Sequence, residues 1–283
     1  MKIGFIGAGK VGFSLGKYFV CNGKLLSGYY SRNIESAKSA AEFTNSKYYQ
    51  NLDEIVRESD VLFLTVPDGQ IENIWKSLKQ YSLTNKIICH CSGALPSTVF
   101  SGIEEHKAFG YSVHPLYAVC DKLQSYRDLS ESYFTIEYSA SQFADKAKEL
   151  KQMFEAFGNK VILINAEQKV KYHAAAVFAS NLVTGLLYKA STLLQECGFD
   201  EDDSREALMP LFVGNCENIK ASGMIEALTG PVERADDATV QKHLDALSGE
   251  YQAIYKNLSR ALVDIAKVKN PDRDYSAVEE DLK

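Results

Sequence analysis

The chain has 283 residues, enough for two domains that each bury a core of their own. Hydrophobic residues make up 46% and charged residues 24%, an ordinary balance for a globular protein. The net charge of −6 argues against nucleic acid or an anionic membrane as a partner, and no apolar run approaches the ~20 residues of a membrane span.

The first twelve residues predict a dinucleotide-binding turn. An apolar strand begins at residue 2, so no leader is expected, and it runs into the pattern G-x-G-x-x-G ahead of a helix over residues 11–22. The first glycine permits a tight turn, the second lets backbone N–H groups approach a pyrophosphate, and the third lets the helix pack closely against the strand. The alternative is a glycine turn in an α/β domain that binds no nucleotide. We assign this whole turn to cofactor binding: Gly7, Ala8, Gly9, Lys10, Val11 and Gly12.

The end of the second expected strand, residues 25–31, favours NADP(H) over NAD(H). NAD sites usually place an acidic residue there to hold the ribose 2′-OH. This chain has Ser31 and Arg32 instead, with no acid until Glu35. An arginine holds a 2′-phosphate in bidentate fashion, so both residues are assigned to the cofactor. The alternative is a solvated Arg32, with Asn33 capping a helix over residues 34–43.

The remaining pattern predicts an α/β half followed by an all-α half. Continuous apolar runs separated by helices are typical of parallel strands covered on both faces, so the fold class is a Rossmann domain with a doubly wound, mostly parallel sheet. No strand is expected beyond residue 165. The expected domains are an NADP-binding Rossmann-like domain over 1–165, a helical substrate and dimerisation domain over 166–268, and a flexible tail over 269–283. Further strands are expected at 48–49, 61–66, 86–91, 109–113, 133–137 and 160–164, and helices at 52–58, 71–78, 167–196, 203–221, 239–247 and 250–267.

The helix over residues 167–196 predicts a homodimer. It is apolar on more than one face, so it needs neighbours on several sides, which a second copy of the chain would supply. The alternative is a monomeric helical bundle.

The six cysteines indicate reduced thiols in a cytoplasmic protein. Their spacing fits neither a disulfide framework nor paired zinc knuckles. Cys89 and Cys91 flank His90 within an expected strand, where alternate side chains point to opposite faces, so no metal site is predicted.

Polar residues follow three expected strands at their carboxyl ends, where open α/β sheets bind ligands. Val66, Pro67 and Asp68 are expected to line the cofactor channel. Ser92 and His114 are candidate catalytic residues. The alternatives are a plain turn at Ser92 and a structural role for His114.

The long helix and one later turn supply the other candidates. His173 and Ser180 are seven residues apart and share a helix face that Asn181 borders, while Lys169 lies one turn before His173. We expect this stripe to face the cleft between the domains, with the histidine as proton donor and serine or asparagine polarising a substrate. The alternative is that these residues hydrogen-bond across helices. Arg234 is a candidate for binding a substrate carboxylate or phosphate, or for pairing with Asp236 or Asp237.

These motifs resemble those of NADP-dependent oxidoreductases that have a Rossmann-like domain and a helical C-terminal domain. That group is distantly related to the β-hydroxyacid dehydrogenases, ketopantoate reductase and pyrroline-5-carboxylate reductase. The resemblance implies a C-terminal domain of the dehydrogenase-dimerisation type and NADP(H) as cofactor, but no substrate. β-Hydroxyacid dehydrogenases carry a catalytic lysine followed four residues later by asparagine, whereas Lys169 is followed at that spacing by His173. The resemblance rests on residues 7–12, 30–32, 65–68, 90–95, 113–116, 172–181 and 229–231, with Arg234.

The sequence therefore predicts an NADP(H)-dependent oxidoreductase that transfers a hydride to or from a small carbonyl or imine, anionic if Arg234 binds it. One alternative is a dinucleotide sensor or partner-binding protein on the same fold. Another is a nucleotide-sugar or flavin ligand in the same glycine turn.

Overall fold

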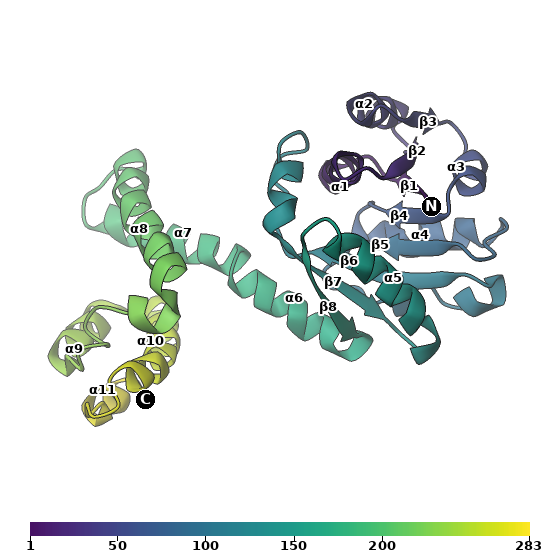
Figure 1. Ribbon diagram of the computed structural model, residues 1–283. Helices are drawn as coiled ribbons and strands as arrows, with labels where there is room; N and C mark the ends of the chain where they lie inside the picture. The colour runs from purple at the N-terminus through teal and green to yellow at the C-terminus, as the bar shows by residue number, and fades with distance from the viewer. The chain divides into compact units, whose positions relative to one another are not determined.

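The computed structural model describes all 283 residues, in two compact units of residues Met1–Ser180 and Asn181–Lys283. Unit 1 is built on one eight-stranded sheet of order β3-β2-β1-β4-β5-β6-β7-β8 (Figure 1). Neighbouring strands run parallel except β6 and β7, which confirms the mostly parallel, doubly wound sheet. The chain turns back after β6, and the β6–β7 connection contains only a short 3₁₀ helix, which is enough for an antiparallel pair. The strands are β1 Lys2–Ile6, β2 Leu25–Tyr30, β3 Lys47–Tyr49, β4 Val61–Leu64, β5 Ile87–His90, β6 Phe109–Pro115, β7 Tyr133–Tyr138 and β8 Lys160–Asn165.

Helices connect most of these strands, close to the predicted positions. Helix α1 ends just before Gly23, which takes a positive φ of 72°, close to the end predicted at residue 22. The Asn33 side chain caps α2 by accepting from the N–H groups of Glu35 and Ser36. The α-helices of unit 1 are α1 Lys10–Cys21, α2 Ile34–Thr44, α3 Leu52–Glu58, α4 Asp68–Leu78, α5 Ala144–Glu155 and α6 Lys169–Phe178, and the 3₁₀ helices are η1 Ser97–Val99, η2 Ile103–His106, η3 Ser125–Glu131, η4 Ser141–Phe143 and η5 Ala166–Gln168.

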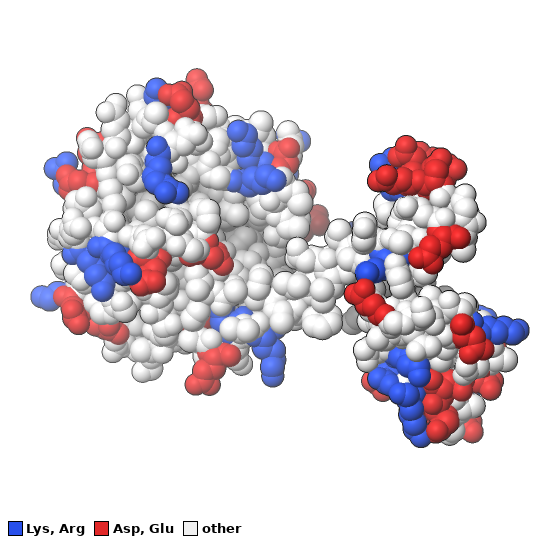
Figure 2. Space-filling model, turned by 180° about the vertical axis from the view of Figure 1, so that it is seen from behind, with Lys and Arg blue, Asp and Glu red and all other residues white.

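The helix expected over residues 167–196 is interrupted. Helix α6 ends in unit 1, and α7 (Asn181–Glu196) begins in unit 2. The Ser180 hydroxyl donates to the Ala176 carbonyl at 2.7 Å, a back-bond of the kind that bends helices. Within the stretch Ala166–Glu196, an 18-residue window has a mean hydropathy of 1.2, so the stretch has the length and composition of a membrane span, which corrects the expectation that no apolar run approaches one. Its visible surface carries few charged side chains (Figure 2). Apolar helices of soluble proteins meet the same description.

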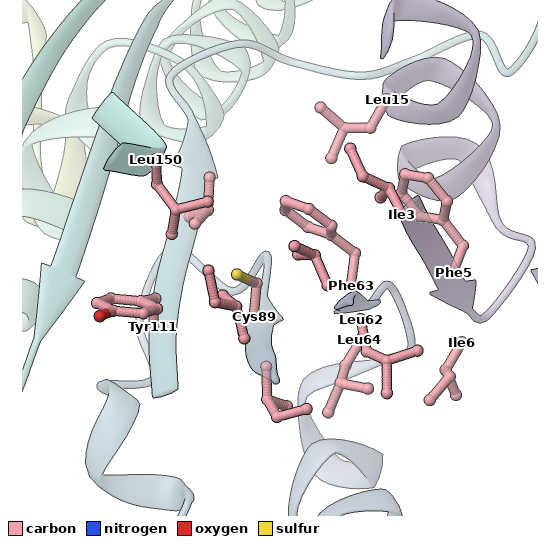
Figure 3. Packing of buried hydrophobic residues seen from close by; sticks show 14 of the residues in the cluster. Ile3, Phe5, Ile6, Leu15, Leu62, Phe63, Leu64, Cys89, Tyr111 and Leu150 are labelled. Atoms are coloured by element: carbon pink, nitrogen blue, oxygen red, sulfur yellow. The ribbon is translucent and has the colours of Figure 1, made fainter. Parts of the chain in front are cut away.

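The core of unit 1 lies between the central strands and the helices on either face. All four residues of β4 are buried. The ring of Phe63 on β4 stacks 5.6 Å from that of Phe5 on β1. Leu15 of α1 and Leu150 of α5 complete the layers around them (Figure 3). This packing fixes the carboxyl ends of β1, β4, β5 and β6, from which the candidate site is built.

Unit 2 is entirely helical, as predicted. Its small core includes Tyr275, Val278 and Leu282, each no more than 2% exposed. The end of the chain is therefore not the flexible tail expected over 269–283. Three apolar residues spaced at 275, 278 and 282 share one helical face and bury it, although their neighbours are polar. The remaining helices of unit 2 are α8 Glu201–Ala227, α9 Asp237–Ala246, α10 Gly249–Lys269 and α11 Ser276–Asp281.

Candidate active site

The three glycines of the N-terminal turn have different steric surroundings. Gly7 has a φ of 108°, and a Cβ placed on it would lie 2.5 Å from the Thr65 carbonyl oxygen. A Cβ on Gly12 would lie 2.7 Å from the Gly7 oxygen and from Thr65 Oγ1. A Cβ on Gly9 would meet nothing within 4 Å. The turn and the close packing of α1 thus depend on Gly7 and Gly12, and the backbone at Gly9 is open to a ligand.

A cavity of about 170 Å³ opens beside this turn. It lies at the carboxyl ends of β1, β2 and β4, where the strand order reverses and doubly wound sheets bind nucleotides. The sequence did not single out Ile6 and Ile74, which line it with apolar surface suited to an adenine ring. Six of the expected cofactor residues line it: Gly7, Gly9, Ser31, Arg32, Val66 and Pro67.

The edge of this cavity suits a 2′-phosphate. Arg32 is exposed, and no carboxylate lies within ion-pair distance of its guanidinium. The nearest acid along the chain, Glu35, pairs with Lys38 at 2.8 Å. A free guanidinium with no acidic residue at the end of β2 fits NADP(H) better than NAD(H).

Asp68 and Ser92 hold two strand ends together. The Ser92 hydroxyl donates to the Asp68 carboxylate at 2.6 Å and accepts from the backbone N–H groups of Leu95 at 2.9 Å and Ala94 at 3.2 Å. These bonds tie the loop after β5 to the start of α4. They favour the turn role for Ser92 over a catalytic one, and Asp68 does not line the cavity. Ala8, Lys10, Val11 and Gly12 also lie outside the cavity lining.

Two histidines converge on Gly93, just beyond β5. A Cβ placed on Gly93 would lie 2.3 Å from His173 Nδ1 and 3.0 Å from His114 Nε2. The two imidazole rings are perpendicular, with centroids 6.2 Å apart. His173 Nδ1 is buried and has no hydrogen-bond partner in the structure. Because buried polar atoms are nearly always paired, His173 Nδ1 is a candidate contact for a substrate atom, and we call the point where both ring nitrogens lie against Gly93 the notch.

Lys169 is the functional candidate that the sequence mentioned but did not assign. Its side chain is fully buried, and Nζ donates to Ser112 Oγ at 2.6 Å. Ser112 in turn donates to the Ser92 carbonyl at 3.1 Å and lies opposite Glu137 in the β6–β7 register. Glu137 is also fully buried and accepts from Ser97 Oγ and Ser97 N at 2.8 and 2.6 Å. A buried lysine and glutamate therefore lie beneath the notch.

Burial and this lysine shift several pKa values. Burial lowers the pKa of Lys169 to about 8, against the opposing effect of Glu137. Burial, followed by the positive charge of Lys169, lowers the pKa values of His90 and His114 to about 3. Burial raises the pKa of Glu137. Groups shifted by burial together with a specific charge are typical of functional sites.

Three predicted site residues remain: Ser180, Asn181 and Arg234. Because α6 ends at Phe178, Ser180 and Asn181 do not continue one helical face from His173. Arg234 of unit 2 is exposed and forms no ion pair, and Asp236 instead caps α9 through Thr239. No ion pair therefore joins Arg234 to Asp236 or Asp237, although the hydrogen bonds from Thr239, and then the charge of Arg234, lower the pKa of Asp236.

Two family models match separate segments of the chain. Residues 2–92 match the family described as NADP oxidoreductase coenzyme F420-dependent, and residues 132–262 match a domain of unknown function, DUF2520. No curated protein matches the chain.

Several solved structures share the fold over nearly the whole chain. A protein from Thermotoga maritima is 25% identical, with a TM-score of 0.74 over 95% of this chain and 99% of that one. A candidate NADP oxidoreductase from Bacteroides fragilis is also 25% identical, with a TM-score of 0.65 over 93% and 98%. A pyrroline carboxylate reductase from Plasmodium falciparum, solved with NADP bound, is 14% identical, with a TM-score of 0.57 over 95% and 98%, and shows the fold alone.

These matches confirm three predictions: the resemblance, the Rossmann domain followed by a helical domain, and the cofactor. The match of residues 2–92 to an NADP oxidoreductase family, and the similarity to the Bacteroides fragilis protein, support NADP(H) as the cofactor. The open backbone at Gly9 and the free Arg32 guanidinium fit that cofactor independently.

Proposed function

We propose that the protein reduces a small carbonyl or imine compound with NADPH at the carboxyl ends of β5 and β6. The observation that carries this proposal is the pair of imidazoles around Gly93, one with a buried and unpaired Nδ1. A reduction needs a group that polarises the acceptor bond, and a ring nitrogen within hydrogen-bond reach does this.

Each part of unit 1 has a role in this proposal. The glycine turn and Arg32 would hold the diphosphate and the 2′-phosphate, and the bound cofactor supplies the hydride. His114 and His173 would bind the substrate heteroatom. The buried Lys169 adds a positive potential that stabilises negative charge developing on that atom. Arg234, exposed and free of ion pairs, remains our candidate for a substrate carboxylate, and Ser180 and Asn181 remain secondary candidates.

Cofactor affinity gives the first test. Nicotinamide fluorescence should show NADPH binding more tightly than NADH. Arg32→Ala should weaken NADPH binding about 10- to 100-fold, the loss expected for a charge-assisted phosphate contact, and leave NADH binding nearly unchanged. Equal weakening of both cofactors would contradict the 2′-phosphate assignment, and no binding of either in the micromolar range would refute the proposal.

Turnover gives the second test. In a screen of carbonyl and imine compounds, oxidation of NADPH should depend on His173, so His173→Ala should lose turnover and keep its NADPH affinity. His243→Ala, an exposed histidine in unit 2, is the matched control and should keep both. Turnover that survives His173→Ala would remove this histidine from the mechanism.

A second candidate function is a sensor of the NADP(H) redox state. The observation that favours it is that hydrogen bonds to Asp68 and Leu95 hold the Ser92 hydroxyl in the loop after β5. Only the two histidines then remain as main candidates for catalysis, and a sensor needs no catalytic residue. Failure of every compound in the screen, together with a partner whose binding depends on NADPH, would select this alternative.

We also propose that the protein forms a homodimer through its helical unit. Large apolar side chains on α7 and α8 are open to solvent in the single chain, and patches of this kind mark protein interfaces. Light scattering should give twice the chain mass of 31.5 kDa, and Leu211→Glu should lower it. The most exposed of these side chains are Tyr188 at 71%, Leu211 at 72% and Met224 at 70%.

A further inference from the structure

His114 is held by a tyrosine on the neighbouring helix. Its Nδ1 lies 2.8 Å from the Tyr172 hydroxyl, and the two rings are perpendicular at a centroid distance of 5.7 Å. The Lys169 ammonium lies 5.5 Å from the centre of the same tyrosine ring. The imidazole is therefore fixed at one nitrogen, and its other nitrogen, Nε2, faces the notch beside Gly93.

The contact with Tyr172 selects one tautomer of His114. A neutral imidazole has one nitrogen that donates and one that accepts. A phenol is a better hydrogen-bond donor than acceptor, so the Tyr172 hydroxyl donates and Nδ1 accepts. The proton of the ring is then on Nε2, because the partner of one ring nitrogen sets the state of the other.

The surroundings keep this ring neutral. The ionisable groups around it are Lys169 and His173 on α6, His90 on β5, and Glu137 on β7. Glu137 is two residues from Thr135, which is paired with His114 in the β6–β7 register. Burial is the main cause, and the Lys169 charge the next, of a His114 pKa lowered to about 3. The Glu137 carboxylate is already bound to both donors of Ser97, so it offers the ring little compensation.

We propose that Tyr172 is a positioning residue that fixes His114 as a neutral Nε2–H donor, and that the substrate of the reductase is a carbonyl compound. This inference rests on the function proposed above. A carbonyl oxygen has lone pairs that accept the Nε2–H, whereas a protonated imine nitrogen has none to offer. Reduction then adds a hydride from NADPH to the carbonyl carbon, moves the π electron pair to oxygen, and takes a proton from water, leaving an alcohol and NADP⁺. His114 stabilises the oxygen without giving up its proton.

Histidine NMR of the protein without cofactor tests the assignment directly. The chain has five histidines, so ¹⁵N-histidine labelling gives a simple spectrum, and His114→Gln assigns one ring. We expect the Nε2–H pattern for His114, unchanged from pH 5.5 to 8.5. A ring that titrates in this range, or that carries its proton on Nδ1, would overturn the proposal.

Two conservative variants separate the tautomer effect from general disruption. Tyr172→Phe should move the His114 signals toward a mixture of tautomers while the other signals stay in place. The chain offers a matched control, because His243 Nδ1 contacts the Tyr255 hydroxyl at 2.9 Å with the same perpendicular ring geometry at an exposed position. Tyr255→Phe should leave the His114 signals unchanged. Unchanged His114 signals in Tyr172→Phe would also refute the role of Tyr172.

The substrate part has its own readout. With a carbonyl substrate found, Tyr172→Phe should lower kcat about 10-fold or more, with NADPH affinity unchanged. Turnover of imines alone would overturn the carbonyl assignment. If no compound is reduced at all, the proposed function fails, while the NMR result independently decides the state of His114.

Discussion

Replacing Lys169 by methionine tests whether this lysine is buried as a charged group. The methionine keeps most of the side-chain volume and removes the ammonium that donates to Ser112. The pKa of Lys169 is about 8 in the folded protein, against an ordinary value of 10.5 in the unfolded chain. The buried lysine therefore disfavours folding at any pH where it is charged in the folded and in the unfolded chain. This cost is complete below pH 8 and disappears as the pH rises through 10.5, because the unfolded chain then loses its proton as well.

The size of the effect follows from these two values. Proton linkage gives a cost of about 3 kcal/mol at pH 7 and about 1 kcal/mol at pH 10. The wild type should therefore gain about 2–3 kcal/mol of unfolding free energy over this range relative to Lys169→Met. Taking the difference between the two proteins cancels the groups that titrate in both. In the variant, Glu137 loses the favourable charge of Lys169. This changes the unfolding free energy of the variant by an amount that stays nearly constant between pH 7 and pH 10.

Urea unfolding at pH 7 and pH 10 measures the difference. The single tryptophan, Trp75, is fully buried in unit 1, so its fluorescence follows the unit that contains Lys169. Lys171→Met is the matched control, an exposed lysine on the same helix that should show no such pH dependence. If wild type and Lys169→Met change in parallel between the two pH values, the lysine is not buried as a charge and the reasoning is wrong.

Three further outcomes are expected from the packing. Gly12→Ala should abolish NADPH binding, because its methyl group would lie 2.7 Å from Thr65 Oγ1, whereas Gly69→Ala meets nothing within 4 Å and should bind normally in the same fluorescence titration. Asn159→Ala should lower the unfolding free energy by about 2–4 kcal/mol in urea, because the Asn159 side chain accepts from Tyr18 and donates to two backbone carbonyls in the core; a loss under 1 kcal/mol would contradict this. Deleting residues 271–283 should speed proteolysis of unit 2, because it removes three side chains from the core of that unit. Equal cleavage rates in the full chain and the truncated chain would instead support the flexible tail that the sequence predicted.

Local steric rules explain what the sequence could predict. The glycine turn, the strand ends and the absence of an acid beside Arg32 each depend on residues adjacent in the chain, so six of the residues that line the cofactor cavity could be predicted. The direction of β7 could not, because it depends on how the β6–β7 connection packs. His114 and His173 were both predicted as candidates, but their convergence on Gly93 was not, since it joins β5, β6 and α6.

Burial decided the remaining differences. The sequence places Lys169 one helical turn before His173, but only the three-dimensional structure shows that its amine is fully buried and donates to Ser112. The last fifteen residues are polar on average, yet three apolar side chains are enough to anchor them. Composition averages over a segment and therefore misses a single buried face.

The interruption at Ala179 and Ser180 determines where the protein can be divided. Lys169, Tyr172 and His173 follow the last strand, but all three lie in the unit that ends at Ser180. An expression fragment stopped at residue 165 would keep the nucleotide cavity and lose every group that α6 brings to the notch. A fragment ending at 180 retains both, so any exchange of helical halves between related proteins must carry α6 with the nucleotide-binding part.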